Sequence, residues 1–460
     1  MSFIKKYLVS KFNKLIKVNH KNCYDPNNKK FWCKECVPRC IIEGWTSGNN
    51  DIDNFIKDTM YDVNNGVYED DNGYYYCCYP LFLEWVPFNR FKDVKLIGEG
   101  GFAKVYSATW IDGRAEYIKR NDGNWIKEEP NSIKVALKRL NGLQNISADF
   151  LNELKTHWKL NCLQYDSLRF YGITKDSETN EFMMIMQFAD NGNLRNILSS
   201  NFNNIFWNIK LGYLYCLVND LRNLHLLGYS HKDFHSGNIL NNDIGTYISD
   251  FGLSGPSNKQ KSDYKIYGVL PYIAPEVLNG ELYTISSDIY SFGVVMAEVS
   301  SGKPPFHNRK HDASLALDIC NGIRPVFGKG TPEIYKKLAH RCMNANPSQR
   351  PTTNELHETL FCWWYYMDNE EYGYKGEDVY VAFKEADKEI PNILTSYEKN
   401  SDAIYISRAF TFNNLSKPIN SPFITSLYLN EENNEDCQDS QLVDLEVPNM
   451  SNEFPDNEQL

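Results

Sequence analysis

Asp233, Asn238 and Asp250 have side chains that could carry out phosphoryl transfer. Asn238 follows Asp233 by five residues, and Asp250 follows Asn238 by twelve. A carboxylate can orient an attacking hydroxyl group, and oxygen ligands can hold Mg²⁺ against phosphates. A loop followed by a hairpin could therefore bring one base and two metal-binding groups to the same point. Three residues are a weak signal alone, so the other parts of such a site must also be present.

A glycine-rich turn earlier in the chain could contact phosphates. Residues 96–106 predict a strand, a turn containing Gly98 and Gly100, and a second strand. Glycines let the backbone approach phosphates closely, so that its N–H groups can donate to phosphate oxygens. Ordinary tight hairpins carry the same pattern. A strand after the turn nevertheless argues against a dinucleotide-binding crossover and against a Walker-type loop.

A lysine and a glutamate could complete the phosphate site. Lys138 ends the predicted strand 135–138, where its ammonium group could neutralise nucleotide phosphates. Glu153 lies on a predicted helix, beside an apolar face that includes Leu154 and Trp158. A glutamate paired with Lys138 would hold the ammonium group over the phosphates. Without that partner, Lys138 would be an ordinary solvated strand lysine.

The order of the predicted elements indicates an α+β fold with two lobes. Strands and one helix before residue 190 predict a small N-lobe with an antiparallel sheet. Leucines at helical spacing from residue 211 to 224, followed by a glycine at 228, predict a long buried helix that leads into the catalytic stretch. The larger C-lobe is predicted to be mostly helical, with further helices at 285–301, 313–321, 332–343 and 354–363.

With these parts in this order, residues 91–361 resemble the eukaryotic protein kinase family. The resemblance implies that Asp233 is the catalytic base, that Lys138 and Glu153 form the phosphate-positioning pair, and that Asn238 and Asp250 bind Mg²⁺. It also implies an ATP site, with Ala103 in place of the loop's third glycine. The residues expected to bind ATP are Ile97, Gly98, Gly100, Ala103, Val105, Ala136, Lys138, Ala189 and Leu240.

The resemblance implies further roles outside the ATP site. Met186 would stand at the rear of the adenine pocket, and residues 187–189 would form the hinge between the lobes. Glu276 would pair with Arg350, and Asp288 would brace the catalytic loop.

The chain looks most like the tyrosine-kinase-like group of mainly serine/threonine kinases. This implies transfer of the γ-phosphate of ATP to Ser or Thr hydroxyls of protein substrates in intracellular signalling, with Mg²⁺ as cofactor. Four residues depart from the usual pattern: Lys232 replaces an arginine, His235 a lysine, Val269 a threonine and Met343 a tryptophan. The alternative interpretations are a tyrosine-directed kinase and a catalytically weak kinase-fold scaffold that binds ATP.

Residues 1–82 are interpreted as an N-terminal extension. Residues 1–21 predict a basic amphipathic helix, which could dock on the protein's own surface or make a weak peripheral contact with a membrane. Four cysteines follow, and they could hold a structural Zn²⁺ or be ordinary reduced thiols. They are Cys23, Cys33, Cys36 and Cys40.

Charge and composition narrow the possible partners and the cellular location of the protein. The net charge is −11, and residues 431–460 contain ten Asp or Glu and no Lys or Arg. The middle of the chain is therefore close to neutral, which gives no reason to propose nucleic acid as a partner. No apolar run is long enough to predict a transmembrane segment. Twelve scattered cysteines and no signal-peptide pattern predict a cytoplasmic protein, with the nucleus as the alternative.

The chain after the kinase-like region divides into two parts. Residues 362–429 are interpreted as a C-terminal extension, and residues 430–460 as an acidic tail that should be disordered. Within the extension, residues 403–421 contain a few aromatic side chains and could dock on the domain. No chemistry is predicted for them.

Overall fold

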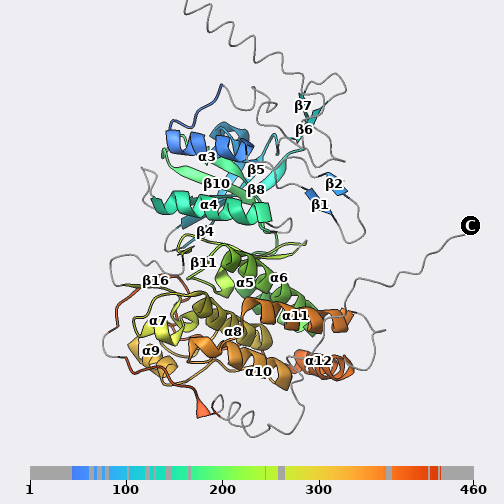
Figure 1. The fold of residues 1–460 in the computed structure, drawn as a ribbon, viewed down its shortest axis with the longest axis vertical. Helices are drawn as coiled ribbons and strands as arrows, with labels where there is room; N and C mark the ends of the chain where they lie inside the picture. Colours follow the sequence, from blue (N-terminus) through green and yellow to red (C-terminus); the bar gives the residue numbers. More distant parts are fainter. Residues whose placement is uncertain are drawn as a thin grey trace, which may run out of the picture.

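The computed structural model describes residues 44–61, 67–69, 75–77, 82–100, 103–114, 116–119, 125–128, 131–140, 148–163, 167–243, 245–256, 265–368, 376–412, 415–422 and 425. They form a smaller lobe built on a sheet and a larger helical lobe, stacked along the long axis of the molecule (Figure 1). The predicted α+β fold class with two lobes is confirmed. The predicted amphipathic helix at 1–21, the four N-terminal cysteines and the acidic tail lie outside the described residues.

A six-stranded sheet forms the N-lobe, in the order β3-β9-β10-β8-β5-β4. Its strands are β3 (Glu84–Trp85), β4 (Phe91–Glu99), β5 (Ala103–Trp110), β8 (Ile133–Leu140), β9 (Phe170–Lys175) and β10 (Phe182–Gln187). Neighbouring strands are antiparallel, except that β3 runs parallel to β9. Gly172 permits this contact, because a Cβ atom there would lie 2.1 Å from the carbonyl oxygen of Glu84.

Among the described residues, two α-helices pack in the N-lobe, one more than the sequence predicted. The predicted helix is α4 (Ala148–Leu163), and the additional one is α3 (Asn50–Tyr61). The apolar residues of α3 recur at helical spacing, and they are buried in one cluster with Leu154 of α4 and Ile173 of β9. These α3 residues are Ile52, Phe55, Ile56 and Met60. The N-terminal extension therefore supplies part of the N-lobe core.

In the described part of the chain before β8, two short antiparallel strand pairs lie outside the six-stranded sheet. One joins β1 (Val67–Glu69) to β2 (Tyr75–Cys77), and the other joins β6 (Glu116–Lys119) to β7 (Trp125–Glu128).

The C-lobe is built around α6 (Trp207–Leu226), whose leucines at the predicted helical spacing are all buried. Gly228 follows the helix with a φ of +74°, the left-handed conformation that glycine adopts without strain at a helix end. A second central helix, α8 (Ile285–Ser301), begins with reciprocal hydrogen bonds between Thr284 and Ser287. The other C-lobe helices are α5 (Leu194–Asn201), α7 (Pro275–Leu278), α9 (Ala313–Cys320), α10 (Glu333–Cys342), α11 (Thr353–Asp368) and α12 (Glu377–Glu389).

Short strands carry the loops that face the N-lobe. They are β11 (Tyr229–Ser230), β12 (Ile239–Asn241), β13 (Thr246–Ile248), β14 (Gly255–Pro256), β15 (Ile266–Gly268) and β16 (Arg408–Phe410). The pairs are β11 with β14, β12 with β13, and β15 with β16, each antiparallel.

The C-terminal extension packs on the C-lobe. Trp363 and Met367 of α11 and Phe383 of α12 are buried in the same cluster as the leucines of α6. Asp387 of α12 accepts a hydrogen bond from the backbone N–H of Trp207, at 2.7 Å, where α6 begins. None of the helices among the described residues combines the length and the apolarity that a membrane-spanning helix needs.

A buried ion pair fixes α7 to the end of the C-lobe. The guanidinium group of Arg350 donates to Oε1 and Oε2 of Glu276, at 2.7 and 2.6 Å, and to the carbonyl oxygen of Ser286, at 2.8 Å. The Arg350 side chain is fully buried. The pairing expected for these two residues is therefore present, and it anchors the segment that ends at α7.

Lys210 is an unusual buried cation in α6. Its side chain is fully buried, and its ammonium group has no hydrogen-bond partner among the described residues. It lies 4.0 Å from the ring centroid of Phe202 and 4.9 Å from that of Trp207. Burial lowers the pKa of Lys210 to about 7, although the charge of Asp387 opposes the shift.

We expect the stability of the wild type to rise between pH 7 and pH 10.5 because of Lys210. Its ordinary pKa is 10.5, so in this window the unfolded chain binds the proton that the folded chain has lost. The free energy of unfolding should then increase by at most about 1.4 kcal/mol per pH unit from this group. Lys210→Met should remove this contribution and stabilise the protein at pH 7 by about 2 kcal/mol, as urea unfolding at pH 7 and pH 9 would measure. Lys329→Met, at an exposed lysine, is the control; identical pH dependence in wild type and Lys210→Met would contradict the interpretation.

Candidate active site

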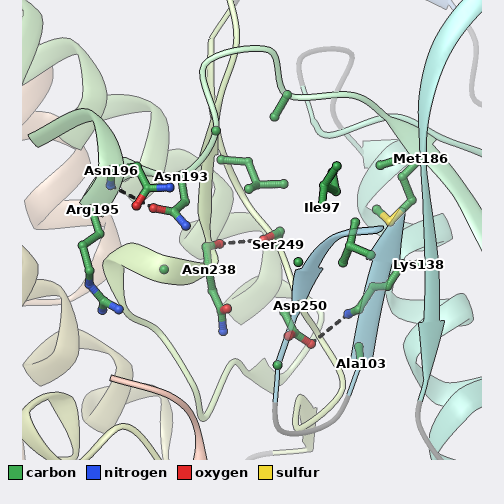
Figure 2. A pocket seen from close by; sticks show the side chains of 18 of the residues that line it. Ile97, Ala103, Lys138, Met186, Asn193, Arg195, Asn196, Asn238, Ser249 and Asp250 are labelled. Atoms are coloured by element: carbon green, nitrogen blue, oxygen red, sulfur yellow. Dashed lines mark hydrogen bonds and ion pairs between the residues drawn. The ribbon is translucent and has the colours of Figure 1, made fainter. Parts of the chain in front are cut away.

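A cavity of about 430 Å³ lies between the glycine-rich turn of the N-lobe and the loops of the C-lobe (Figure 2). It collects all the residues predicted to bind ATP: Ile97, Gly98, Gly100, Ala103, Val105, Ala136, Lys138, Ala189 and Leu240. Asp233, Asn238 and Asp250 also line it. Met186 and the hinge residues lie along the same wall, together with Leu168, which the sequence did not predict. Glu153 lies behind Lys138 and is fully buried.

Lys138 is held between two carboxylates from different elements. Its Nζ lies 2.5 Å from Oε1 of Glu153 on α4. It also lies 2.9 Å from Oδ1 of Asp250, the contact drawn in Figure 2. Burial alone would lower the pKa of Lys138, but the charges of Asp250 and Glu153 raise it well above its ordinary value. Burial would raise the pKa of Asp250, but Lys138 lowers it to about 2. Lys138 is therefore a cation and Asp250 an anion at neutral pH, both beside the cavity.

His157 supports this arrangement, and the sequence did not predict it. It lies one turn after Glu153 on α4, with Nε2 4.0 Å from Oε1 of that residue. Its ring meets the ring of Phe251 edge-on, with 4.6 Å between centroids. Burial, with a smaller contribution from the charge of Lys138, lowers the pKa of His157 to about 3. The imidazole is thus neutral, and it connects α4 to the residue that follows Asp250.

Asp233 and Asn238 lie together on the catalytic loop. The side-chain amide of Asn238 donates to the carbonyl oxygen of Asp233 at 3.0 Å and to its Oδ2 at 3.2 Å. The backbone N–H and the hydroxyl of Ser249 donate to the carbonyl oxygen of Asn238, each at 2.8 Å (Figure 2). These bonds use the amide nitrogen of Asn238 to fix the loop and leave its side-chain oxygen for another ligand.

Asp288 of α8 supports the loop from below. Its carboxylate accepts hydrogen bonds from the backbone N–H groups of His231, at 2.8 Å, and Lys232, at 3.0 Å. His225 lies 2.9 Å from the same carboxylate. Lys232 has a φ of +68°, a conformation that costs free energy for a non-glycine residue, so the contacts with Asp288 hold a strained backbone.

Of the four departures from the kinase pattern, Lys232 and His235 lie beside Asp233, whereas Met343 is buried in the C-lobe core. His235 places Nε2 3.6 Å from Oδ1 of Asp233, while its Nδ1 accepts a hydrogen bond from the N–H of Gly237 at 3.0 Å. Lys232 reaches the carbonyl oxygen of Pro256 at 3.4 Å. Val269 is buried and so contributes packing where the family has a hydroxyl. His235 is thus the residue that flanks the base where the family carries a lysine.

The side chains of Asn238 and Asp250 suit Mg²⁺. Both offer oxygen atoms, which this cation prefers, and Asp250 stays ionised at neutral pH because of its lowered pKa. The carboxylate of Asp250 is about one-third exposed toward the cavity. Lys138 contacts its Oδ1. The predicted zinc site is different: its four cysteines lie outside the described residues, and the part of the chain that the structure describes shows no metal-binding group of three or more His, Cys, Asp or Glu.

Ser407 reaches the same site from the C-terminal extension. Its hydroxyl donates a short hydrogen bond to Oδ2 of Asp233. Ser407, Ile406 and Tyr405 line the cavity together with the nucleotide-site residues. The sequence predicted that this segment could dock on the domain, which the structure confirms, but it did not predict a contact with Asp233. No local pattern around residue 407 signals the contact, because the two residues are 174 positions apart.

The comparison with known proteins agrees with this geometry. Residues 91–360 match the family of protein tyrosine and serine/threonine kinases. The match covers more than half of the chain, and the chain therefore belongs to this eukaryotic protein kinase family. Members of this family act on protein substrates with ATP and Mg²⁺.

Three individual relatives are 27–28% identical to this chain. A probable serine/threonine-protein kinase of Dictyostelium discoideum is 27% identical over 288 residues, which cover 60% of this chain and 15% of the relative. The probable serine/threonine-protein kinase mkcD of the same organism is 28% identical over 59% of this chain and 39% of its own length. The cytokinesis protein sepH of Aspergillus niger is 27% identical over 58% of this chain and 18% of its own. The chain thus spans less than half the length of these relatives.

Proposed function

We propose that this chain transfers the γ-phosphoryl group of ATP to serine or threonine hydroxyls of protein substrates. The proposal rests on one observation: the ionised pair of Lys138 and Asp250 lies in the same cavity as Asp233. The carboxylate of Asp233 already accepts a hydrogen bond from a serine hydroxyl. These three side chains come from elements of both lobes, which must pack together to bring them into one cavity. A scaffold without catalytic activity would not require all of them.

Each side chain has a distinct part in the reaction. Lys138, held by Glu153, binds the phosphates of ATP, and the glycine-rich turn covers them. Asp233 orients the attacking hydroxyl and accepts its proton. The bond that forms joins the hydroxyl oxygen to the γ-phosphorus, and the bond that breaks is the one between this phosphorus and the oxygen bridging to the β-phosphate. ADP is the leaving group.

Asn238 and Asp250 would hold Mg²⁺. When bound, the cation neutralises the negative charge of the phosphates. The protein contributes the positions of the two oxygen donors. The amide nitrogen of Asn238 is bonded to Asp233, and Lys138 is bonded to Asp250, so neither donor can rotate freely.

Two observations favour serine and threonine over tyrosine. The side chain that contacts Asp233 is the short one of Ser407, which directly precedes β16, the strand paired with β15. A tyrosine hydroxyl extends several ångströms further from the backbone and would need a deeper groove. In addition, the relatives named above include probable serine/threonine kinases.

Phosphoamino-acid analysis tests the proposal. The purified full-length chain, incubated with labelled ATP, Mg²⁺ and a generic basic protein, should yield mainly phosphoserine and phosphothreonine. Lys138→Met removes the ammonium group that binds the phosphates, and the labelling should fall at least a hundred-fold, on the order of the loss of one preorganised charge. A product that is mostly phosphotyrosine would overturn the choice of hydroxyl. Equal labelling by wild type and Lys138→Met would overturn the kinase activity itself.

The remaining predictions concern residues outside the described part of the chain and the location of the protein in the cell. We retain as proposals a structural Zn²⁺ on Cys23, Cys33, Cys36 and Cys40, a weak membrane contact through residues 1–21, and a cytoplasmic location. They are supported by residue type and charge pattern alone. Metal analysis of protein purified without chelators, liposome binding with and without residues 1–21, and imaging in cells would test them in turn.

A further inference from the structure

The segment from residue 400 to 412, here called the tail segment, lies across the place where a protein substrate must bind. Its strand β16 pairs antiparallel with β15, in the register Ile266 to Phe410 and Gly268 to Arg408. β15 belongs to the stretch between Asp250 and Glu276. In Figure 1, β16 lies at the level of the boundary between the two lobes. An extended chain that adds a strand to an exposed edge in this way is a common mode of peptide binding.

Side chains on both sides of Ser407 anchor the tail segment. The Tyr405 ring lies 4.7 Å from the guanidinium group of Arg195 and meets the ring of His311 edge-on at 4.8 Å. Its hydroxyl donates to the carbonyl oxygen of Pro305 at 2.8 Å. On the other side, the guanidinium group of Arg408 donates to the carbonyl oxygen of His311 at 2.6 Å.

Further contacts fix the tail segment before Tyr405. Ala403 is buried, and the backbone N–H of His311 donates to the carbonyl oxygen of Asp402 at 3.1 Å. The buried ring of His311 lies 2.9 Å from the carbonyl oxygen of Ile404 through Nδ1. The segment is therefore held along its length, and the position of Ser407 is set from both ends.

The position of Ser407 is that of a phosphate acceptor. Its hydroxyl donates to Oδ2 of Asp233, the group that orients the attacking oxygen. It lies in the same cavity as Lys138 and Asp250, which bind the phosphates and the cation in the proposed reaction. Resting on that proposed function, we infer that Ser407 is phosphorylated by its own chain and that the tail segment blocks protein substrates until this happens.

The reaction is the one proposed for substrates, with Ser407 as the acceptor. Its Oγ attacks the γ-phosphorus of ATP, its proton passes to Asp233, and ADP leaves. The product places a phosphate of about −2 charge next to the carboxylates of Asp233 and Asp250. Like charges at this distance repel, so the phosphorylated segment leaves the groove. Phosphorylation then converts a bound segment into an open site.

The first test measures whether the transfer is intramolecular. The purified full-length chain, incubated with ATP and Mg²⁺, should carry phosphate on Ser407 by mass spectrometry. The rate per molecule should not change over a hundred-fold range of protein concentration. Ser407→Thr should keep the phosphate at this position, and Ser407→Ala should lose it. Ser401→Ala, which removes an exposed hydroxyl of the same segment, should leave the phosphorylation of Ser407 unchanged.

The second test measures whether the tail segment blocks substrates. Wild-type protein should phosphorylate a generic basic protein after a lag, and prior incubation with ATP and Mg²⁺ should abolish the lag. Ser407→Ala should remain slow throughout, because the segment is never released. Tyr405→Ala removes the ring that packs against Arg195 and His311, and it should start at the full rate without a lag.

The outcomes separate this inference from the proposed function. Phosphorylation of the basic protein with none on Ser407 would overturn the inference and leave the kinase activity intact. A rate per molecule that rises in proportion to protein concentration would overturn the intramolecular step. Equal initial rates of phosphorylation of the basic protein by wild type, Ser407→Ala and Tyr405→Ala would contradict the inference that the tail segment blocks protein substrates. Failure of every variant to label either Ser407 or the basic protein would instead remove the proposed function, and the inference with it.

Discussion

Replacing Asp233 by Asn is expected to lower kcat about a thousand-fold, since a positioned general base contributes between a hundred-fold and ten-thousand-fold. The amide keeps nearly the same shape but cannot accept the proton of the attacking hydroxyl. The affinity for ATP should change little, because the phosphates are held by Lys138 and the glycine-rich turn on another wall of the cavity. Steady-state kinetics with a generic basic protein would measure kcat, and thermal stabilisation by ATP and Mg²⁺ would measure binding.

The matched control is Asp243→Asn, which makes the same chemical change at an exposed aspartate on a neighbouring loop. Its kcat should equal that of the wild type. A kcat of Asp233→Asn within tenfold of the wild type would show that Asp233 is not the group that orients the hydroxyl. Loss of ATP binding in the variant would show that the substitution disturbed the whole site.

Replacing Arg350 by Leu should destabilise the protein by roughly 3–5 kcal/mol. The substitution leaves the carboxylate of Glu276 buried without its cationic partner, and removing one member of a buried pair is far more costly than losing an exposed pair. Arg350 also donates to the carbonyl oxygens of Ser286 and Asn344, which would lose these hydrogen bonds. The free energy of unfolding, measured in urea at pH 7, would show the loss.

Arg90→Leu provides the comparison for this second prediction. Arg90 pairs with Asp112 on the surface, where its side chain is 44% exposed. Water can replace the lost partner there, so the unfolding midpoint should stay that of the wild type. The double substitution Glu276→Leu with Arg350→Leu should recover part of the stability that Arg350→Leu loses. If Arg350→Leu unfolds at the same urea concentration as Arg90→Leu, the buried pair does not anchor α7.

Residue types and spacing, together with the resemblance to protein kinases, predicted the residues that line the cavity. Lys138, Asp233 and Asp250 each belong to a short local pattern, and the order of these patterns along the chain specifies the two lobes. His157 was missed because its contact with Phe251 depends on how α4 packs against the C-lobe. A histidine one turn away from a buried glutamate was the available signal.

The contribution of the two extensions was harder to predict. The apolar residues of α3 have a clear helical spacing, so this helix could have been found, but not the surface against which it packs. Ser407 could not have been found, because an isolated serine has no local signature and the contact depends on the path of the chain after α12. The fold could thus be predicted from local patterns, whereas the contact of Ser407 with Asp233 depends on the tertiary structure.

The packing of α3 and β3 shows that the region similar to the kinase family is shorter than the region that packs as one unit. Similarity to the kinase family begins at residue 91, but Ile52 and Ile56 cover Leu154 and Ile173 from a segment that precedes it. A recombinant fragment cut at residue 91 would present that apolar surface to water and to other copies of itself, which favours aggregation. Expression of a soluble kinase fragment should therefore start no later than residue 44.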